Sequence, residues 1–281
     1  MVDESRIAPK ACEYWQMNRL SRSPLNPYTP FLRWLQTDSE ENYRRQGNKA
    51  FSIESVGYHF NSLGYRGDEF ELDSGRVRVV FLGDSNTFGL GTPWEGLWTA
   101  HVTKHLEERW GMPVHQSNLA WGGTGSDYIA MTIHPSVEVL KPAAVFVLWP
   151  LVRRATWFDD AGRPVHFIPQ WIPGEYRKDH EAFLRLATEP YGFFNYVRNF
   201  HIVNDRLVRL GIPYYWGNIE AYSPELLSRY VPLDRFAGVW DKLDFARDGL
   251  HGGLKSHIAF ANLVISAIER DKVSPYSWPG R

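Results

Sequence analysis

Two short motifs, far apart in the sequence, contain the residue types of a nucleophilic site. Gly83-Asp84-Ser85 directly follows the apolar run Val77–Leu82, and Asp248-Gly249-Leu250-His251 lies near the end of the chain. A serine hydroxyl is a weak nucleophile until a base takes its proton, and histidine is the usual base near neutral pH. The histidine needs a carboxylate on its other ring nitrogen, and Asp248 is three residues away. The motifs therefore predict a Ser85–His251–Asp248 triad.

Neither motif is decisive alone. An isolated Asp-x-x-His is more often a helix cap followed by a surface histidine. Here the pair follows the last predicted strand and precedes a helical segment, so it would lie opposite Ser85 at one edge of a sheet. That position favours the triad over the helix cap.

Alternating strands and helices must bring these residues together. Short apolar runs predict strands at 77–82, 114–119, 144–149 and 212–216, and amphipathic spacing predicts helices at 94–110, 126–139, 194–210 and 254–270. This alternation is typical of an α/β protein, with a central parallel sheet between two helical layers in a flavodoxin-like three-layer α/β/α sandwich. Ligands of such sheets bind at the carboxyl ends of the strands.

The remaining segments predict one domain with additions. Residues 1–50 lack clean periodicity and are interpreted as an arm packed on a single domain, 51–281. Residues 155–193 are rich in Trp, Pro and Gly and are interpreted as an insertion. Trp121, Trp149 and Trp157 follow or end predicted strands and are the candidates for a cleft wall.

With these motifs in order, the chain resembles the SGNH/GDSL hydrolase family. Gly83-Asp84-Ser85-Asn86-Thr87-Phe88-Gly89 resembles the family's first block, and Asn118-Leu119-Ala120-Trp121-Gly122-Gly123 resembles the second. Asp248-Gly249-Leu250-His251, followed by His257 in a helix, resembles the fifth, and Asn61-Ser62-Leu63-Gly64-Tyr65-Arg66-Gly67 resembles a segment of some acyl-sugar esterases and acetyltransferases. The resemblance implies Ser85 as nucleophile and the backbone N–H groups of Ser85 and Gly123 as oxyanion donors.

The family's third block is absent. Where the family has Gly-x-Asn-Asp after its third strand, this chain has Leu151-Val152-Arg153-Arg154, which aligns Arg153 with the oxyanion asparagine. Two interpretations stay open: Arg153 contacts the oxyanion or an anionic substrate group, or both arginines form surface ion pairs. Asn86, Asn118 and Trp121 are the other candidate substrate contacts, although Asn118 is expected to be structural.

Composition excludes several classes of function. The 281 residues include 31 basic and 32 acidic side chains, a formal net charge of −1, which argues against a nucleic-acid binder. The single cysteine, Cys12, excludes an intramolecular disulfide and a thiolate metal cluster. His101 and His105 are spaced like a metal pair but lack a third ligand, so we expect neither metal nor cofactor. No secretory signal or membrane span of about 20 apolar residues is visible, which predicts a cytoplasmic protein.

The sequence thus predicts a serine hydrolase that cleaves carboxylic esters through an acyl-enzyme, with a small molecule or an acylated carbohydrate as substrate. The same triad would serve an O-acyltransferase that passes the acyl group to a sugar hydroxyl, with residues 157–191 as the acceptor region. Two alternatives belong to other classes. One is a phosphate-binding module at residues 83–89; the other is an impaired SGNH-like protein that binds a glycan or a partner.

Overall fold

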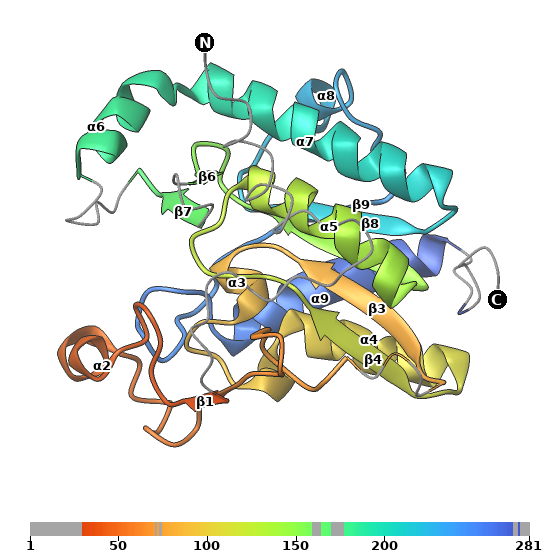
Figure 1. Ribbon diagram of the computed structural model, residues 1–281. Helices are drawn as coiled ribbons and strands as arrows, with labels where there is room; N and C mark the ends of the chain where they lie inside the picture. Colours follow the sequence, from red (N-terminus) through yellow and green to blue (C-terminus); the bar gives the residue numbers. More distant parts are fainter. Residues whose placement is uncertain are drawn as a thin grey trace, which may run out of the picture.

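A parallel sheet of five strands lies at the centre of the protein (Figure 1). The computed structural model describes residues 30–70, 72, 75–158, 164–169, 177–271 and 275. The strands, in the spatial order β4-β3-β5-β8-β9, are β3 (Val77–Leu82), β4 (Val114–Asn118), β5 (Ala144–Trp149), β8 (Tyr214–Asn218) and β9 (Phe236–Val239). Every neighbouring pair is parallel, which confirms the predicted sheet.

Helices cover both faces of the sheet. In Figure 1, α5 and α7 lie on one side and α4 and α9 on the other. Their bounds are α4 (Trp98–Trp110), α5 (Ser126–Leu140), α7 (Glu189–Arg209) and α9 (Leu254–Arg270). Successive side chains of a strand point to opposite faces. Accordingly Val80 and Leu82 belong to the core under α5 and α7, while Val79 and Phe81 belong to the core under α4 and α9. The predicted three-layer sandwich is confirmed.

Several boundaries differ from the prediction. The short strand β9 was not predicted, because it has only four half-buried residues, one of which is Gly238. The helix expected over 94–110 is divided into a 3₁₀ turn, η2 (Trp94–Gly96), and α4. Helix α7 begins before the expected residue 194, since Thr188 caps it by accepting a hydrogen bond from Tyr191 N–H.

The described part of the predicted arm packs against the carboxyl ends of the central strands. It contains β1 (Phe31–Leu32), which pairs antiparallel with β2 (Tyr58–His59), and α2 (Glu40–Gln46). An aromatic core beneath it joins Tyr58 and Phe60 to Phe88 and Trp121. Residues 1–29 of the arm lie outside the described residues.

The predicted insertion at 155–193 contains a hairpin of β6 (Ala155–Phe158) and β7 (Pro164–Phe167), then α6 (Arg177–Leu186). Residues 159–163 and 170–176 of this prediction are outside the described residues. Residues 189–193, the last part of the predicted insertion, instead form the first turn of α7, which covers one sheet face together with α5.

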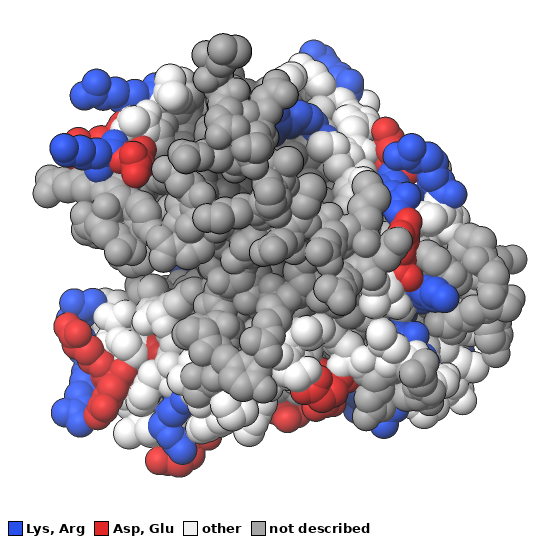
Figure 2. Space-filling model, in the orientation of Figure 1, with Lys and Arg blue, Asp and Glu red and all other residues white. Residues whose placement is uncertain are grey.

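Charged side chains of both signs are interspersed around the described part of the face shown in Figure 2, as the net charge of −1 leads one to expect. No described helix has the length and the apolar composition needed to cross a bilayer.

The strand order decides where a site can form. Strand β3 lies between β4 and β5. The chain leaving β3 reaches β4 through α4 on one face of the sheet, and the chain leaving β4 crosses to β5 through α5 on the other face. Such a switch point opens a crevice at the strand ends. The segments that follow β3, β4 and β5 are those that contain Ser85, Gly123 and the two arginines.

Candidate active site

A tight turn after β3 presents Ser85. Gly83 allows it, because a Cβ atom there would lie 2.2 Å from Thr87 Oγ1 and 2.9 Å from Leu148 O. The buried Asp84 then caps the short helix α3 (Ser85–Phe88), since its Oδ1 accepts the Asn86 N–H at 2.9 Å. The turn and the cap together hold Ser85 at the start of this helix.

The predicted triad residues meet in space. His251 Nε2 lies 2.9 Å from Ser85 Oγ, and His251 Nδ1 lies 2.6 Å from Asp248 Oδ2. Both distances are within hydrogen-bond range, and the first joins residues 166 positions apart in the sequence. In this arrangement His251 Nε2 can accept the serine proton, while Nδ1–H donates to the carboxylate.

Asp248 is buried, and both of its carboxylate oxygens accept hydrogen bonds. Its Oδ1 accepts the backbone N–H groups of Leu250 at 2.9 Å and His251 at 3.0 Å. Burial by itself would raise the pKa of this carboxyl group. The hydrogen bond and charge of His251, with the two backbone N–H groups, outweigh burial and lower its pKa to about 2. Asp248 is therefore a carboxylate at any pH where a histidine base works.

The N-terminal arm supplies a further contact to the triad. The hydroxyl of Thr37 donates to Asp248 Oδ2 at 2.9 Å, on the oxygen that also faces His251. The next residue, Asp38, forms a buried ion pair with Arg247, which precedes Asp248. Sequence reasoning missed these residues, because nothing in the local pattern around position 37 indicates a partner 211 positions away.

We expect Thr37→Val to lower kcat about tenfold with little change in KM. The substitution keeps the side-chain shape and removes one hydrogen bond to a charged group, a contribution of roughly 1.5–3 kcal/mol. Steady-state kinetics on a short aryl ester measures the effect, and Thr37→Ser, which keeps the hydroxyl, is the matched control. Equal kcat for Thr37→Val and the parent protein would contradict the assignment.

The second predicted motif forms a loop against the Ser85 turn. Trp121 N–H and Thr124 Oγ1 both donate to Gly83 O, at 3.4 and 3.3 Å. Gly123 between them has a φ of +82°, and a Cβ atom there would lie 2.9 Å from Ile168 Cδ1. Within the described residues, neither the Ser85 N–H nor the Gly123 N–H is used in a hydrogen bond. Both amides are thus available as oxyanion donors, as the resemblance implies.

The other candidate substrate contacts form hydrogen bonds or packing contacts within the protein. Asn118 is buried, donates to Thr87 O at 2.9 Å and accepts Ala120 N–H at 3.1 Å, so it joins the two loops structurally. Asn86 is half-buried, and its side chain bonds Asp84 Oδ1 at 3.2 Å. Trp121 is not a cleft wall: it is buried in the aromatic core with Phe60 and Phe88.

The other two tryptophans that were predicted to line the cleft, Trp149 and Trp157, differ in their exposure. Trp149 is also buried, because β5 is covered on both faces, and its Nε1–H donates to the Tyr214 hydroxyl at 2.7 Å. Trp157, in contrast, is 58% exposed and lines a cavity of about 820 Å³ between the β6–β7 hairpin, α6 and α7. One residue that lines this cavity, Thr156, accepts the N–H of Gly125, two residues after Gly123.

The two arginines after β5 have different roles. Arg153 is exposed, and its Nε–H donates to Ala187 O at 3.3 Å, so it takes no part in the Ser85 turn. Arg154 forms an ion pair with Asp84, the residue before Ser85. A turn closed by Arg154 N–H and Leu151 O redirects the chain here. The sequence alignment took no account of this turn, and it therefore placed Arg153 rather than Arg154 at the position of the oxyanion asparagine.

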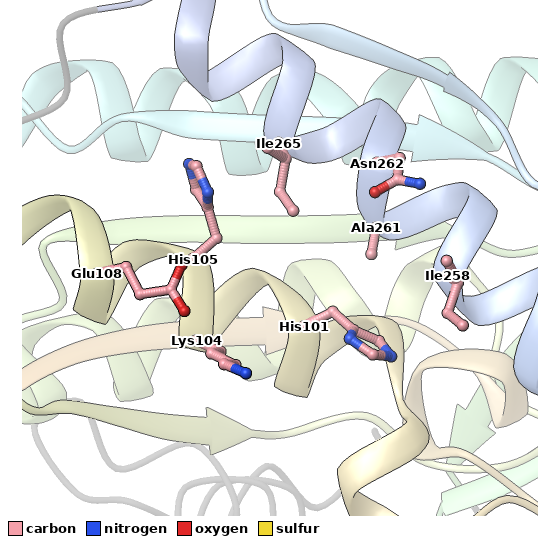
Figure 3. Close-up of a pocket in the computed structure, with 8 residues that line it drawn as sticks. All are labelled: His101, Lys104, His105, Glu108, Ile258, Ala261, Asn262 and Ile265. Carbon is pink, nitrogen blue, oxygen red and sulfur yellow. The ribbon is translucent and has the colours of Figure 1, made fainter.

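The pair His101 and His105 lies on α4, where the helix packs against α9. Figure 3 shows their rings extending in different directions from α4, over a cavity of about 270 Å³ against α9. His105 Nε2 instead contacts Glu269 Oε1 at 2.8 Å. Nowhere in the described ranges do three or more His, Cys, Asp or Glu side chains form a group that could hold a metal ion.

His257, at the start of α9, is buried behind the site. Its Nδ1 accepts the Trp98 N–H at 3.2 Å, which requires an unprotonated ring nitrogen. Burial, followed by the Arg66 charge, lowers its pKa to about 3. The unfolded chain binds this proton near pH 6.5, so the contribution of a neutral His257 is complete above that pH. It is lost progressively as the pH falls from about 6.5 toward 3.

We therefore expect His257→Asn to flatten the acid side of the stability profile. The unfolding temperature of the parent should fall more steeply between pH 6.5 and 4 than that of the variant. Thermal unfolding at a series of pH values measures both slopes, and the same change at the exposed His59 is the control. Parallel slopes for parent and His257→Asn would refute the expectation.

The arrangement of sheet and site has a known type. Ser85 follows the first strand of the parallel sheet, the glycine loop follows the second, and the Asp–His pair precedes the last helix. The strand order, the helical layers and the positions of these motifs agree with the SGNH/GDSL-like fold that the sequence resemblance implies.

No family model matches the sequence, and the curated proteins yield no match. Among solved structures, a lipase from a goat rumen metagenome is 14% identical, with a TM-score of 0.43 over 68% of this chain and 97% of that one. TesA is 14% identical, with a TM-score of 0.44 over 69% and 98%. A Clostridium thermocellum family 3 carbohydrate esterase is 16% identical, with a TM-score of 0.41 over 71% and 100%. These likenesses are distant, and the function of this protein has to be inferred from its own side chains.

Proposed function

We propose that this protein is a serine hydrolase of carboxylic esters. The observation that supports it best is the continuous contact from Ser85 Oγ to His251 Nε2 and from His251 Nδ1 to Asp248 Oδ2. A phosphate-binding module at residues 83–89 would leave this buried, hydrogen-bonded carboxylate and its histidine without a role.

The reaction follows from the geometry. Ser85 Oγ attacks the ester carbonyl carbon while His251 Nε2 takes its proton, and the carbonyl oxygen becomes an oxyanion. The Ser85 and Gly123 N–H groups donate to that oxygen. As the carbonyl re-forms, the bond to the alcohol breaks and His251 returns the proton to the leaving oxygen. Water then attacks the acyl-Ser85 ester by the same steps.

A reactive fluorophosphonate tests the nucleophile without knowledge of the natural substrate. We expect intact-mass measurement to show one adduct on the parent protein and none on Ser85→Ala. Ser55→Ala, at an exposed serine outside the site, should label like the parent. Labelling of Ser85→Ala to the same extent as the parent would exclude Ser85 as nucleophile.

We further propose that the cavity beside the hairpin receives the alcohol portion of the ester, with an acylated carbohydrate as the substrate class. Aromatic and polar side chains line it, including Trp157, Phe167, Phe183, Tyr191, Asp127, Asn195 and Arg198. Exposed Trp and Tyr rings offer an apolar face with a polar edge, which suits a sugar ring. Asp127 is held in place by the side-chain amides of Asn195 and Asn199, at 3.0 and 3.1 Å.

This proposal predicts a selective effect of Trp157→Ala. Loss of one aromatic contact of roughly 0.5–1.5 kcal/mol beyond its buried area should raise KM for an acylated oligosaccharide about tenfold. KM for a short aryl ester, which does not fill the cavity, should stay unchanged. Steady-state kinetics on both substrates decides, and an equal change for both would argue against the cavity as the alcohol site.

The same cavity could seat an acceptor sugar in an acyl transfer. Ester turnover in ¹⁸O-labelled water, with and without an added oligosaccharide, separates the two reactions. Hydrolysis places the label in the released acid, whereas transfer yields an unlabelled acylated sugar.

A further inference from the structure

Arg154 is a largely buried arginine that uses few of its hydrogen-bond donors. Its side chain is 15% exposed, and its described partner is Asp84 Oδ2, which accepts from Nη1. Its Nε–H is buried and has no partner. A guanidinium group has five N–H donors, and a buried donor without an acceptor is costly.

Two arginines near the site that are more deeply buried, Arg66 and Arg247, show the contrast. Arg66 donates to four backbone carbonyls, those of Gly57, Phe88, Gly89 and Thr92. Arg247 donates to both oxygens of Asp38 and to three backbone carbonyls. Those guanidinium groups are satisfied by the fold, whereas Arg154 retains donors for an acceptor that the protein does not supply.

The position of Arg154 indicates that acceptor. Its carbonyl oxygen lies against Gly125, where a Cβ atom would be only 2.6 Å away, and its guanidinium reaches Asp84. The side chain therefore extends from the loop that contains Gly123 to the turn that contains Ser85. These segments are in direct contact, because Thr124 Oγ1 donates to Gly83 O. An oxyanion bound by the Ser85 and Gly123 amides would form between the same two segments.

We propose that Arg154 is the third donor of the oxyanion hole, in place of the side-chain amide of the missing third block. This inference rests on the proposed esterase function. As Ser85 Oγ bonds the carbonyl carbon, the carbonyl π electrons move onto oxygen, and the guanidinium donates to the resulting negative charge. It keeps that contact until the carbonyl re-forms and the alcohol leaves with the proton from His251.

Asp84 positions the guanidinium for this role. One carboxylate oxygen caps α3 by accepting the Asn86 N–H, and the other holds Arg154 Nη1. The same carboxylate thus orients both the nucleophile turn and the guanidinium. A positive charge set beside the reacting oxygen in advance needs no reorganisation during the reaction.

The test is a kinetic comparison on a short, neutral aryl ester, which has no permanent anion for an arginine to bind. We expect Arg154→Ala to lower kcat about 100- to 1000-fold, the usual effect of removing one oxyanion donor, with KM within about twofold of the parent. Added guanidinium chloride at low millimolar concentration should restore part of kcat. Arg153→Ala, one residue away and exposed, should keep the parent kinetics.

Arg154→Ala leaves the Asp84 carboxylate buried without its partner, and this can unfold the protein. A second comparison therefore removes the carboxylate as well. Asn is also a good helix cap, and Asp84→Asn therefore keeps the cap while removing the carboxylate. The double variant Asp84→Asn/Arg154→Met should have a kcat at least about 100-fold below that of Asp84→Asn alone, at a similar unfolding temperature.

Three outcomes would overturn the inference. These are an unchanged kcat in the Arg154 variants, an increase in KM alone on a substrate that has an anionic group, or a loss of kcat that only tracks unfolding. Ser85→Ala is measured alongside, so that the failures can be told apart. If Ser85→Ala is inactive and the Arg154 variants are fully active, the esterase proposal stands and the role of Arg154 does not.

Discussion

Ser85→Ala should lower kcat for a short aryl ester by about 10⁴- to 10⁶-fold while leaving the fold intact. In the proposed mechanism, the Ser85 hydroxyl is the group that forms the acyl-enzyme. Once it is gone, His251 has no proton to take, and the oxyanion donors alone can still assist a water attack. The residual rate should therefore exceed the uncatalysed rate.

The fold should tolerate this change because, among the described residues, the hydrogen bond of the Ser85 hydroxyl is the one with His251 Nε2. Thermal unfolding and steady-state kinetics on the same sample separate activity from stability. Asp248→Asn is a companion variant with an expected loss of about 10⁴-fold, since an amide at Nδ1 favours the wrong tautomer of His251. A Ser85→Ala protein with parent-like kcat would eliminate the triad mechanism, whatever the distances.

Arg247→Ala should lower the free energy of unfolding by about 3–5 kcal/mol. Arg247 and Asp38 are both fully buried, and the guanidinium also bonds the backbone carbonyls of Arg33, Ile53 and Val56. Truncating the arginine leaves the Asp38 carboxylate buried without a partner, and three carbonyls lose a donor. Urea unfolding of parent and variant measures the difference.

A matched control is Arg44→Ala, which breaks an exposed ion pair with Glu40 in α2. Exposed pairs contribute about 0–1 kcal/mol, so this variant should unfold close to the parent. Because the buried pair anchors the segment with Thr37, Arg247→Ala should also lower kcat. Equal losses of stability in the two variants would mean that the buried pair does not hold the arm to the sheet.

The sequence predicted the sandwich well because each central element has its own local signal. The β-branched and aromatic run at 77–82 and the apolar run at 144–149 are strands in the structure, and the helix at 254–270 has its predicted bounds. The edge strand β9 was missed because its residues are only half-buried and lack such a run.

The candidate site, too, was predicted from the sequence only in part. Ser85, Asp248 and His251 were predictable, because strand ends of a parallel sheet meet at one edge and the motifs contain the residue types of a triad. Trp121 and Trp149 were wrongly predicted as cleft walls. An aromatic side chain at a strand end can be buried in a core or can line a cleft. Only the packing of the aromatic core and the two helical layers decides which.

By itself, then, the sequence determined most of the elements, their order and which residues are proposed as the triad, since periodicity and short motifs are local properties. Only the tertiary structure decided that Thr37 contacts Asp248, that Asp38 pairs with Arg247, and that Arg154 rather than Arg153 reaches Asp84. These contacts join segments up to 211 positions apart or depend on the direction of one turn. The local spacing of residues predicts neither which distant segments come into contact nor which way a turn directs the chain, because both depend on how the whole chain packs.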